Sequence, residues 1–127
     1  MAVKMLHTCI RVYDLEKSLE FYKEALGLIE TRRSDFKEQK FTLVYLSNEI
    51  GGYEIELTYN YDPEKPYEIG NGFSHLAIGV DNLEAEREKH IALGYEVTEI
   101  KGLPGQETRY YFVTDPDGYR VEVIRNR

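Results

Sequence analysis

The stretch FSHLAIGV, residues 73–80, has the pattern of a β-strand that carries a histidine on one of its faces. Leu76, Ile78 and Val80 alternate along it, as the buried face of a strand does. His75 falls on the opposite face, among small neighbours. Most histidines in strands have structural roles, so this residue alone says little about function. Its meaning depends on a second stretch near the start of the chain.

The stretch LHTCIRV, residues 6–12, repeats this pattern, with His7 in the place of His75. In both copies the strand is followed by a helix-capping residue, a helical pattern and a glycine that ends it. These expected caps and stops are, in chain order, Asp14, Gly27, Asn82 and Gly94. The chain is therefore an internal duplication of one supersecondary unit.

Three strand-like runs follow each expected helix, and turn-forming residues separate the last two runs of each set. The runs are residues 27–31, 41–46 and 53–59 in the first copy and residues 95–100, 108–114 and 119–125 in the second. We therefore predict an α+β fold of two tandem βαβββ modules, whose curved mixed sheets surround a shared cleft. The chain is expected to be one domain, residues 1–127, with modules at about 1–60 and 73–127 and a connector at about 61–72.

Composition excludes several classes of partner. The chain has 127 residues, of which 42% are hydrophobic and 31% charged, as in ordinary soluble globular proteins. A net charge of -7 leaves no basic stripe for nucleic acid or anionic lipid. No apolar run is long enough for a membrane span. We expect a cytoplasmic protein without nucleic-acid or membrane partners, in which Cys9 is a buried thiol and His90 lies on a helix surface.

Each copy also carries one glutamate in its final strand, and Glu56 corresponds to Glu122. Glutamates are common on solvated strand faces, and either one alone would carry no weight. The repetition of one histidine and one glutamate in both copies favours a shared site. Two imidazole nitrogens and two carboxylates suit Ni, Co, Zn, Mn or Fe(II). The sequence therefore predicts that His7, Glu56, His75 and Glu122 are metal ligands.

Two polar residues share the strand faces of the expected ligands. Arg11 follows His7 by four residues, and Asn60 follows Glu56 by four. Four residues of strand span about 13 Å, at about 3.3 Å per residue. This separation suits an elongated substrate whose anionic, amide-bearing tail is held by Arg11 and Asn60. The alternative for Arg11 is a surface charge at the end of a strand.

Four separated segments resemble glyoxalase I, the lactoylglutathione lyase family of the vicinal oxygen chelate superfamily. They are HTCIRVYDLEKSLEFYKEALGL, EIELTYN, HLAIGVDN and FVTDPDGYRVEVI. The resemblance implies that His7, Glu56, His75 and Glu122 ligate the metal and that Arg11 and Asn60 contact glutathione. It also implies a homodimer, in which each site combines the first module of one chain with the second module of the other. The short chain resembles the bacterial nickel- or cobalt-activated form more than the longer zinc form.

The reaction implied by this resemblance detoxifies methylglyoxal. The hemithioacetal that forms from methylglyoxal and glutathione is isomerised to S-lactoylglutathione through an enediolate. A divalent metal stabilises the developing charge and a positioned base carries the proton. Glu122 is the expected base, and Glu56 is its pseudosymmetric partner for the other substrate stereoisomer. Since a cation lowers the proton affinity of its ligands, we expect Glu122 to loosen from the metal when substrate arrives.

The sequence departs from the family at Pro104, where relatives often carry a basic residue for the glycyl carboxylate of glutathione. Lys101 or Arg109 would have to replace it, which leaves another low-molecular-weight thiol open as the co-substrate. Alternatives within the same fold are an acyl-CoA epimerase, an extradiol dioxygenase, a thiol transferase and a drug-binding resistance protein. Glu56 disfavours the three enzymes, and four metal ligands would have no purpose in a protein that only sequesters a drug.

Overall fold

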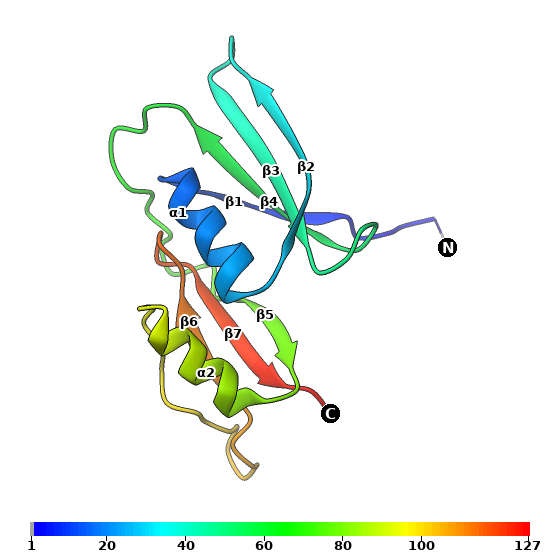
Figure 1. The fold of residues 1–127 in the computed structure, drawn as a ribbon, viewed down its shortest axis with the longest axis vertical. Helices are drawn as coiled ribbons and strands as arrows, with labels where there is room; N and C mark the ends of the chain where they lie inside the picture. Colours follow the sequence, from blue (N-terminus) through cyan, green and yellow to red (C-terminus); the bar gives the residue numbers. More distant parts are fainter. Residues whose placement is uncertain (1) are drawn as a thin grey trace. The chain divides into compact units, whose positions relative to one another are not determined.

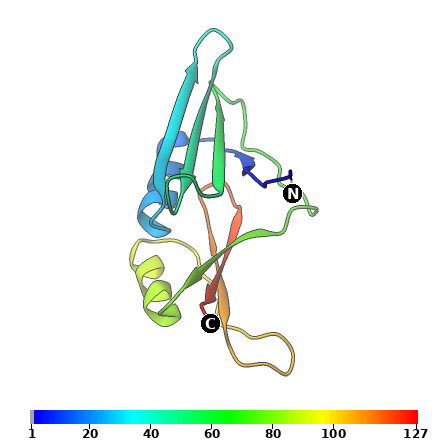
Figure 2. The same ribbon diagram turned by 90° about the vertical axis from the view of Figure 1, so that its right-hand side faces the viewer.

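The computed structural model describes residues 2–127, and its chain divides into two compact units between Tyr67 and Glu68 (Figures 1 and 2). We call these the first half and the second half. Each half has its own sheet and its own helix, and each is described by itself.

The first half holds a four-stranded sheet of order β1-β4-β3-β2. Its elements are β1 (His7–Arg11), α1 (Leu15–Glu20), the π-helical turn η1 (Phe21–Ala25), β2 (Ile29–Phe36), β3 (Phe41–Ser47) and β4 (Glu54–Asn60). The first and last strands, β1 and β4, run parallel, whereas β2, β3 and β4 pair antiparallel. The helical segment carries the chain from β1 to β2 at the opposite edge of the sheet. Two antiparallel connections then bring β4 back beside β1, parallel to it.

One face of this sheet is buried beneath α1 and η1 (Figure 1). Asp14 caps α1 by accepting a hydrogen bond from the Lys17 backbone nitrogen at 3.2 Å, as expected. Gly27 ends the helical segment with φ of 72°, a left-handed conformation that glycine adopts without steric strain because it has no Cβ. Buried hydrophobic residues on this face of the half include Ile10, Val12, Leu19, Phe21, Tyr22, Ala25, Val44, Leu46 and Leu57.

The second half repeats this plan with a three-stranded sheet of order β5-β7-β6. Its elements are β5 (His75–Val80), α2 (Leu83–Ala92), β6 (Tyr110–Thr114) and β7 (Arg120–Arg125). Again the first and last strands are parallel. Asn82 caps α2 through its side-chain oxygen, 3.0 Å from the Ala85 backbone nitrogen, and Gly94 follows the helix with φ of 90°. The predicted α+β class, with a duplicated unit and mixed sheets, is confirmed.

The strand expected at residues 95–100 is wrong in detail, because that segment meets β6 only through isolated bridges. Thr98 explains the interruption. Its backbone nitrogen donates to the Phe112 carbonyl at 2.9 Å, but its hydroxyl accepts the Phe112 N–H at 2.9 Å. The Thr98 carbonyl accepts instead from Nε of Arg87 at 2.9 Å. Two side chains have therefore replaced the backbone bonds of a regular ladder.

His90 is fully buried and not on the helix surface, so that expectation is wrong. Its position explains the burial, because His90 lies two turns after the buried Leu83 and shares its face of α2. Nδ1 of His90 lies 2.8 Å from the hydroxyl of Tyr111, which comes from the core-facing side of β6. Burial raises the pKa of Tyr111, so the phenol stays neutral.

We expect Tyr111→Phe to lower the free energy of unfolding by about 1–3 kcal/mol, because it removes a hydrogen bond from a fully buried imidazole. Urea denaturation followed by circular dichroism measures the loss. Tyr110→Phe is the matched control, since its side chain is half-buried on the other face of the same strand. Equal stability of the two variants would show that the His90 contact adds nothing.

Among residues 2–127, no helix is both long enough and apolar enough to cross a membrane.

Candidate metal centre

In the first half, His7 and Glu56 lie on the sheet face opposite the helix. The strand register pairs Cys9 of β1 with Glu56 of β4, so His7, two residues earlier, shares the face of Glu56. Nε2 of His7 lies 3.9 Å from Oε1 of Glu56, and both side chains are partly accessible. The structure thus brings the predicted pair of this half together.

Tyr45 of β3 contacts both members of this pair. It is the register partner of Glu56, and its hydroxyl donates a hydrogen bond to Oε2 of that carboxylate. Its ring meets the His7 imidazole edge to face, with centroids 5.6 Å apart. The central carbon of the Arg32 guanidinium lies 3.6 Å from the centre of the same ring. Tyr45 therefore orients the glutamate and the histidine at once.

The surroundings of Glu56 keep it ionised. Burial by itself would raise the pKa of this carboxyl, but hydrogen bonds from Tyr45 and Cys9 and the nearby His7 lower the pKa below its ordinary value. An ionised carboxylate is the form that ligates a metal.

Cys9 is exposed, so the expectation of a buried thiol is wrong. The physical reason is the face it occupies: Cys9 alternates with the buried Ile10 and points away from the helix. Its sulfur lies 3.2 Å from the Thr58 hydroxyl. Partial desolvation, more than any other cause, raises the pKa of this exposed thiol, and the neighbouring Glu56 raises the pKa further.

The second half carries the equivalent pair. Nε2 of His75 on β5 lies 3.1 Å from Oε1 of Glu122 on β7. The hydroxyl of Ser74 lies 2.7 Å from Nδ1 of the imidazole, which leaves Nε2 directed at the carboxylate. Phe112 is the register partner of Glu122, and its ring meets His75 edge to face at 5.2 Å. Arg120 lies 4.0 Å from the centre of that ring.

Both pairs have the chemistry of metal ligands, and the second-half pair also has their spacing. Two donor atoms that each lie about 2.1 Å from an ion and at right angles are about 3.0 Å apart. The second-half pair matches this spacing at 3.1 Å, and the first-half pair, at 3.9 Å, has to close slightly. Within residues 2–127 no three or more His, Cys, Asp or Glu side chains form a group that holds a metal. Each half thus supplies one pair of donors, and the four-ligand centre stays a prediction.

Arg11 and Asn60 lie where the predicted substrate contacts require. Arg11 ends β1 on the face of His7 and is exposed, opposite Thr58. Asn60 ends β4 on the face of Glu56, with its Oδ1 3.4 Å from the hydroxyl of Tyr67. Both lie at the far end of the strands from His7. Their role in binding stays a prediction.

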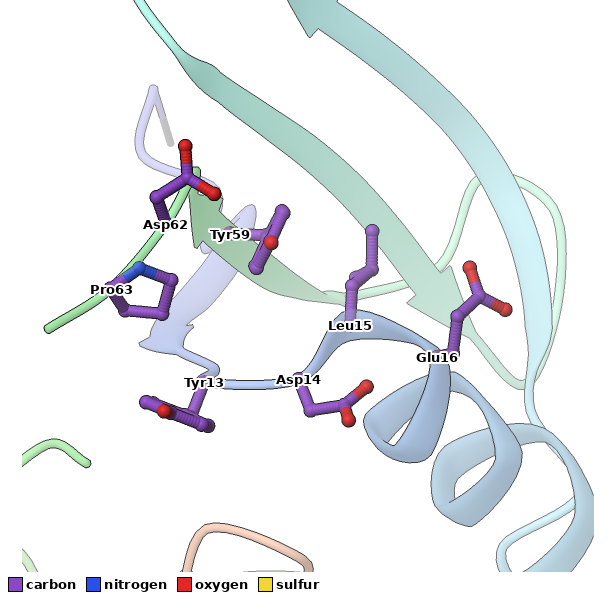
Figure 3. A pocket seen from close by; sticks show the side chains of 7 residues that line it. All are labelled: Tyr13, Asp14, Leu15, Glu16, Tyr59, Asp62 and Pro63. Atoms are coloured by element: carbon purple, nitrogen blue, oxygen red, sulfur yellow. The ribbon is translucent and has the colours of Figure 1, made fainter. Parts of the chain in front are cut away.

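A pocket of about 470 Å³ lies in the first half, away from the candidate centre (Figure 3). It is lined by Tyr13, Asp14, Leu15, Glu16, Tyr59, Asp62 and Pro63. Tyr59 alternates with Asn60 along β4, so this pocket opens on the helix face of the sheet and not on the face of His7 and Glu56. It is therefore no part of the candidate centre.

The sequence analysis missed Tyr45 and Phe112, the aromatic residues beside the two pairs. A signal was present, because each lies in the strand before the last of its half, directly across from the glutamate. The sequence marked these segments only as strand-like runs, and the residue that faces the glutamate emerges only from the strand register.

Comparison with known proteins agrees with this geometry. Residues 4–123 match the Glyoxalase/Bleomycin resistance protein/Dioxygenase superfamily. A lactoylglutathione lyase of Haemophilus influenzae is 44% identical, covering 98% of this chain and 94% of its own. A probable lactoylglutathione lyase of Vibrio cholerae is 43% identical, covering 98% of this chain and 91% of its own.

Among solved structures, glyoxalase I from Zea mays superposes with a TM-score of 0.91 and 35% identity over 97% of this chain. The chain spans 44% of the length of that maize protein. The resemblance found in four sequence segments is thus confirmed over nearly the whole chain. The chain belongs to the Glyoxalase/Bleomycin resistance protein/Dioxygenase superfamily and, within it, to the family of the lactoylglutathione lyases.

Proposed function

We propose that this chain is a lyase that converts the hemithioacetal of methylglyoxal and glutathione to S-lactoylglutathione, and so detoxifies methylglyoxal. The observation that carries the proposal is the His–Glu pair that recurs in both halves at the same strand register. The names of the full-length relatives agree with it. Because the co-substrate is a reduced thiol, we place the reaction in the cytoplasm.

In this proposal His7, Glu56, His75 and Glu122 hold one divalent metal ion. Each half offers two donors, which is fewer than a stable divalent site uses. We propose a homodimer in which the first half of one chain and the second half of its partner complete each centre. The chain itself then acts as a single domain of two modules.

Nickel or cobalt is the metal that we propose, with zinc as the alternative. The donor set contains imidazole and carboxylate and no thiolate, which suits these ions and does not select zinc. Cys9, the sole cysteine of the chain, lies beside Thr58 and Glu56 and is not counted among the ligands.

The residues of the chain then have distinct tasks. Arg11 binds a carboxylate of the glutathione moiety through its guanidinium, and Asn60 both donates to and accepts from a peptide group. Glu122 removes the proton from the carbon that bears sulfur and hydroxyl, and returns it to the adjacent carbonyl carbon. One C–H bond breaks and another forms, the hydroxyl proton passes to the oxygen of the former ketone, and the product is a thioester. When bound, the divalent metal supplies Lewis-acid stabilisation of the enediolate charge.

Glu56 is the pseudosymmetric counterpart of Glu122 and is proposed to stay bound to the metal while Glu122 acts as the base. Around Pro104, the basic residues for the second carboxylate of glutathione are limited. Nε of Arg109 donates to the Arg125 carbonyl at 3.2 Å, whereas Lys101 is exposed. Lys101 is therefore the residue that we propose for this contact.

The metal requirement can be tested directly. We expect a chelator to abolish thioester formation from methylglyoxal and glutathione, because the C–H proton is too weakly acidic for an unaided carboxylate. Nickel or cobalt, added back separately, should restore turnover, and zinc should restore less. The measurement is the initial rate of thioester absorbance after each addition.

If no metal restored thioester formation, in a protein that still binds one metal ion per chain, the proposal would be contradicted. Activity with a different thiol would change the co-substrate. Activity toward an acyl-CoA or a catechol substrate would favour the epimerase or the dioxygenase of the same fold.

A further inference from the structure

The two His–Glu pairs differ in how their glutamates are held. In the first half, Oε2 of Glu56 accepts a hydrogen bond from the Tyr45 hydroxyl, while Oε1 faces His7. The thiol of Cys9, the register partner of Glu56 on β1, adds a second interaction. This carboxylate is therefore held from two sides, and one of its oxygens is already engaged.

In the second half, both of these donors are absent. Phe112 occupies the place of Tyr45 opposite Glu122, and Ala77 occupies the place of Cys9. Neither side chain has a polar atom. Among the described residues of the second half, His75 is the polar side chain that Glu122 contacts, through Oε1.

The aromatic rings themselves are placed alike, so the hydroxyl is the difference that matters. The ring centroids of Tyr45 and His7 are 5.6 Å apart at an interplanar angle of 82°. Those of Phe112 and His75 are 5.2 Å apart at 76°. Each ring also carries an arginine on one face, at 3.6 Å in the first half and 4.0 Å in the second.

We propose that Tyr45 is a positioning residue that fixes Glu56 as a permanent metal ligand, and that Phe112 leaves Glu122 free to turn away from the metal and carry the proton. This inference rests on the proposed function. It explains why two glutamates at matching positions of a duplicated fold take different roles. The asymmetry is built into side chains that touch the glutamates and not the substrate.

The physical basis is the rotation of a carboxylate. The hydrogen bond from the Tyr45 hydroxyl to the ionised carboxylate opposes rotation of Glu56 about its side-chain bonds. It also leaves a single oxygen, Oε1, to ligate. Glu122 rotates without breaking such a bond. Partners of metal ligands typically change metal affinity or activity by about 10–100-fold when they are replaced.

The first test measures metal binding without any substrate. Tyr45→Phe should weaken nickel binding by about 10-fold or more, and Phe112→Tyr should strengthen it, because it supplies a donor to Glu122. Competition with a chromophoric chelator gives both dissociation constants. Tyr61→Phe is the matched control, because it removes a hydroxyl that lies 2.7 Å from the hydroxyl of Thr42 on β3, in the same half. Its nickel affinity should equal that of the unchanged protein.

The second test measures turnover of the nickel-loaded protein. Phe112→Tyr should lower kcat by about 10–100-fold with little change in KM, because a glutamate held on the metal is a poor base. A purely structural defect would instead lower the melting temperature, which thermal unfolding monitors for each variant.

Two results would overturn the inference: unchanged nickel affinity in Tyr45→Phe, or unchanged kcat in Phe112→Tyr. Failure of the proposed function is distinguishable from both. If the unchanged protein makes no S-lactoylglutathione, the proposed function is wrong. The comparison of nickel affinity between Tyr45→Phe and the unchanged protein still decides whether Tyr45 holds Glu56.

Discussion

Glu122→Gln is expected to lower kcat by about 10³-fold, which is within the range that a positioned general base contributes. Glutamine keeps the shape and one ligating oxygen of the side chain, but it cannot accept the proton. Nε2 of His75 and the altered side chain still meet across β5 and β7, so the second half should fold as before. The rate of thioester formation in the nickel-loaded variant measures the effect.

Glu96→Gln serves as the control for this substitution. Glu96 is exposed, belongs to the same half and lies outside the His–Glu pair. Its variant should keep the full rate. Retention of more than about a tenth of the rate in Glu122→Gln would exclude this glutamate as the base, since a general base contributes at least about 10²-fold.

Mixing two inactive variants is expected to restore activity if each centre is shared between chains. His7→Ala breaks the first-half pair, and His75→Ala breaks the second-half pair, so each homodimer has two broken centres. A heterodimer of the two variants has one centre with both defects and one with none. The purified heterodimer should therefore recover about half of the original activity, because one of its two centres is intact.

The experiment co-expresses the two variants with different tags and measures activity in the doubly purified heterodimer. The control mixes His7→Ala with Glu56→Gln, both of which change the first half. That pair should give no recovery, because every centre then lacks a first-half ligand. Failure of His7→Ala and His75→Ala to complement, in a confirmed heterodimer, would place each centre within a single chain.

Local sequence rules were sufficient for much of the fold. Asp14 and Asn82 cap their helices as expected, because a cap depends on residues three positions away. The strands that carry the two His–Glu pairs were also predictable from alternation. Residues 95–100 form only isolated bridges, because the side chains of Thr98 and Arg87 make hydrogen bonds that a regular strand would make through its backbone. Sequence periodicity does not predict such side-chain hydrogen bonds.

The sequence by itself determined that the chain is a duplicated α+β unit and that one histidine and one glutamate recur in each copy. Both conclusions depend on spacing along the chain. Only the tertiary structure decided which residues touch those glutamates. Tyr45 reaches Glu56 and Phe112 faces Glu122 because strand pairing brings residues from separate strands into register. Contacts across strands depend on this register and not on local sequence, so the difference between the two glutamates appears only in the folded chain.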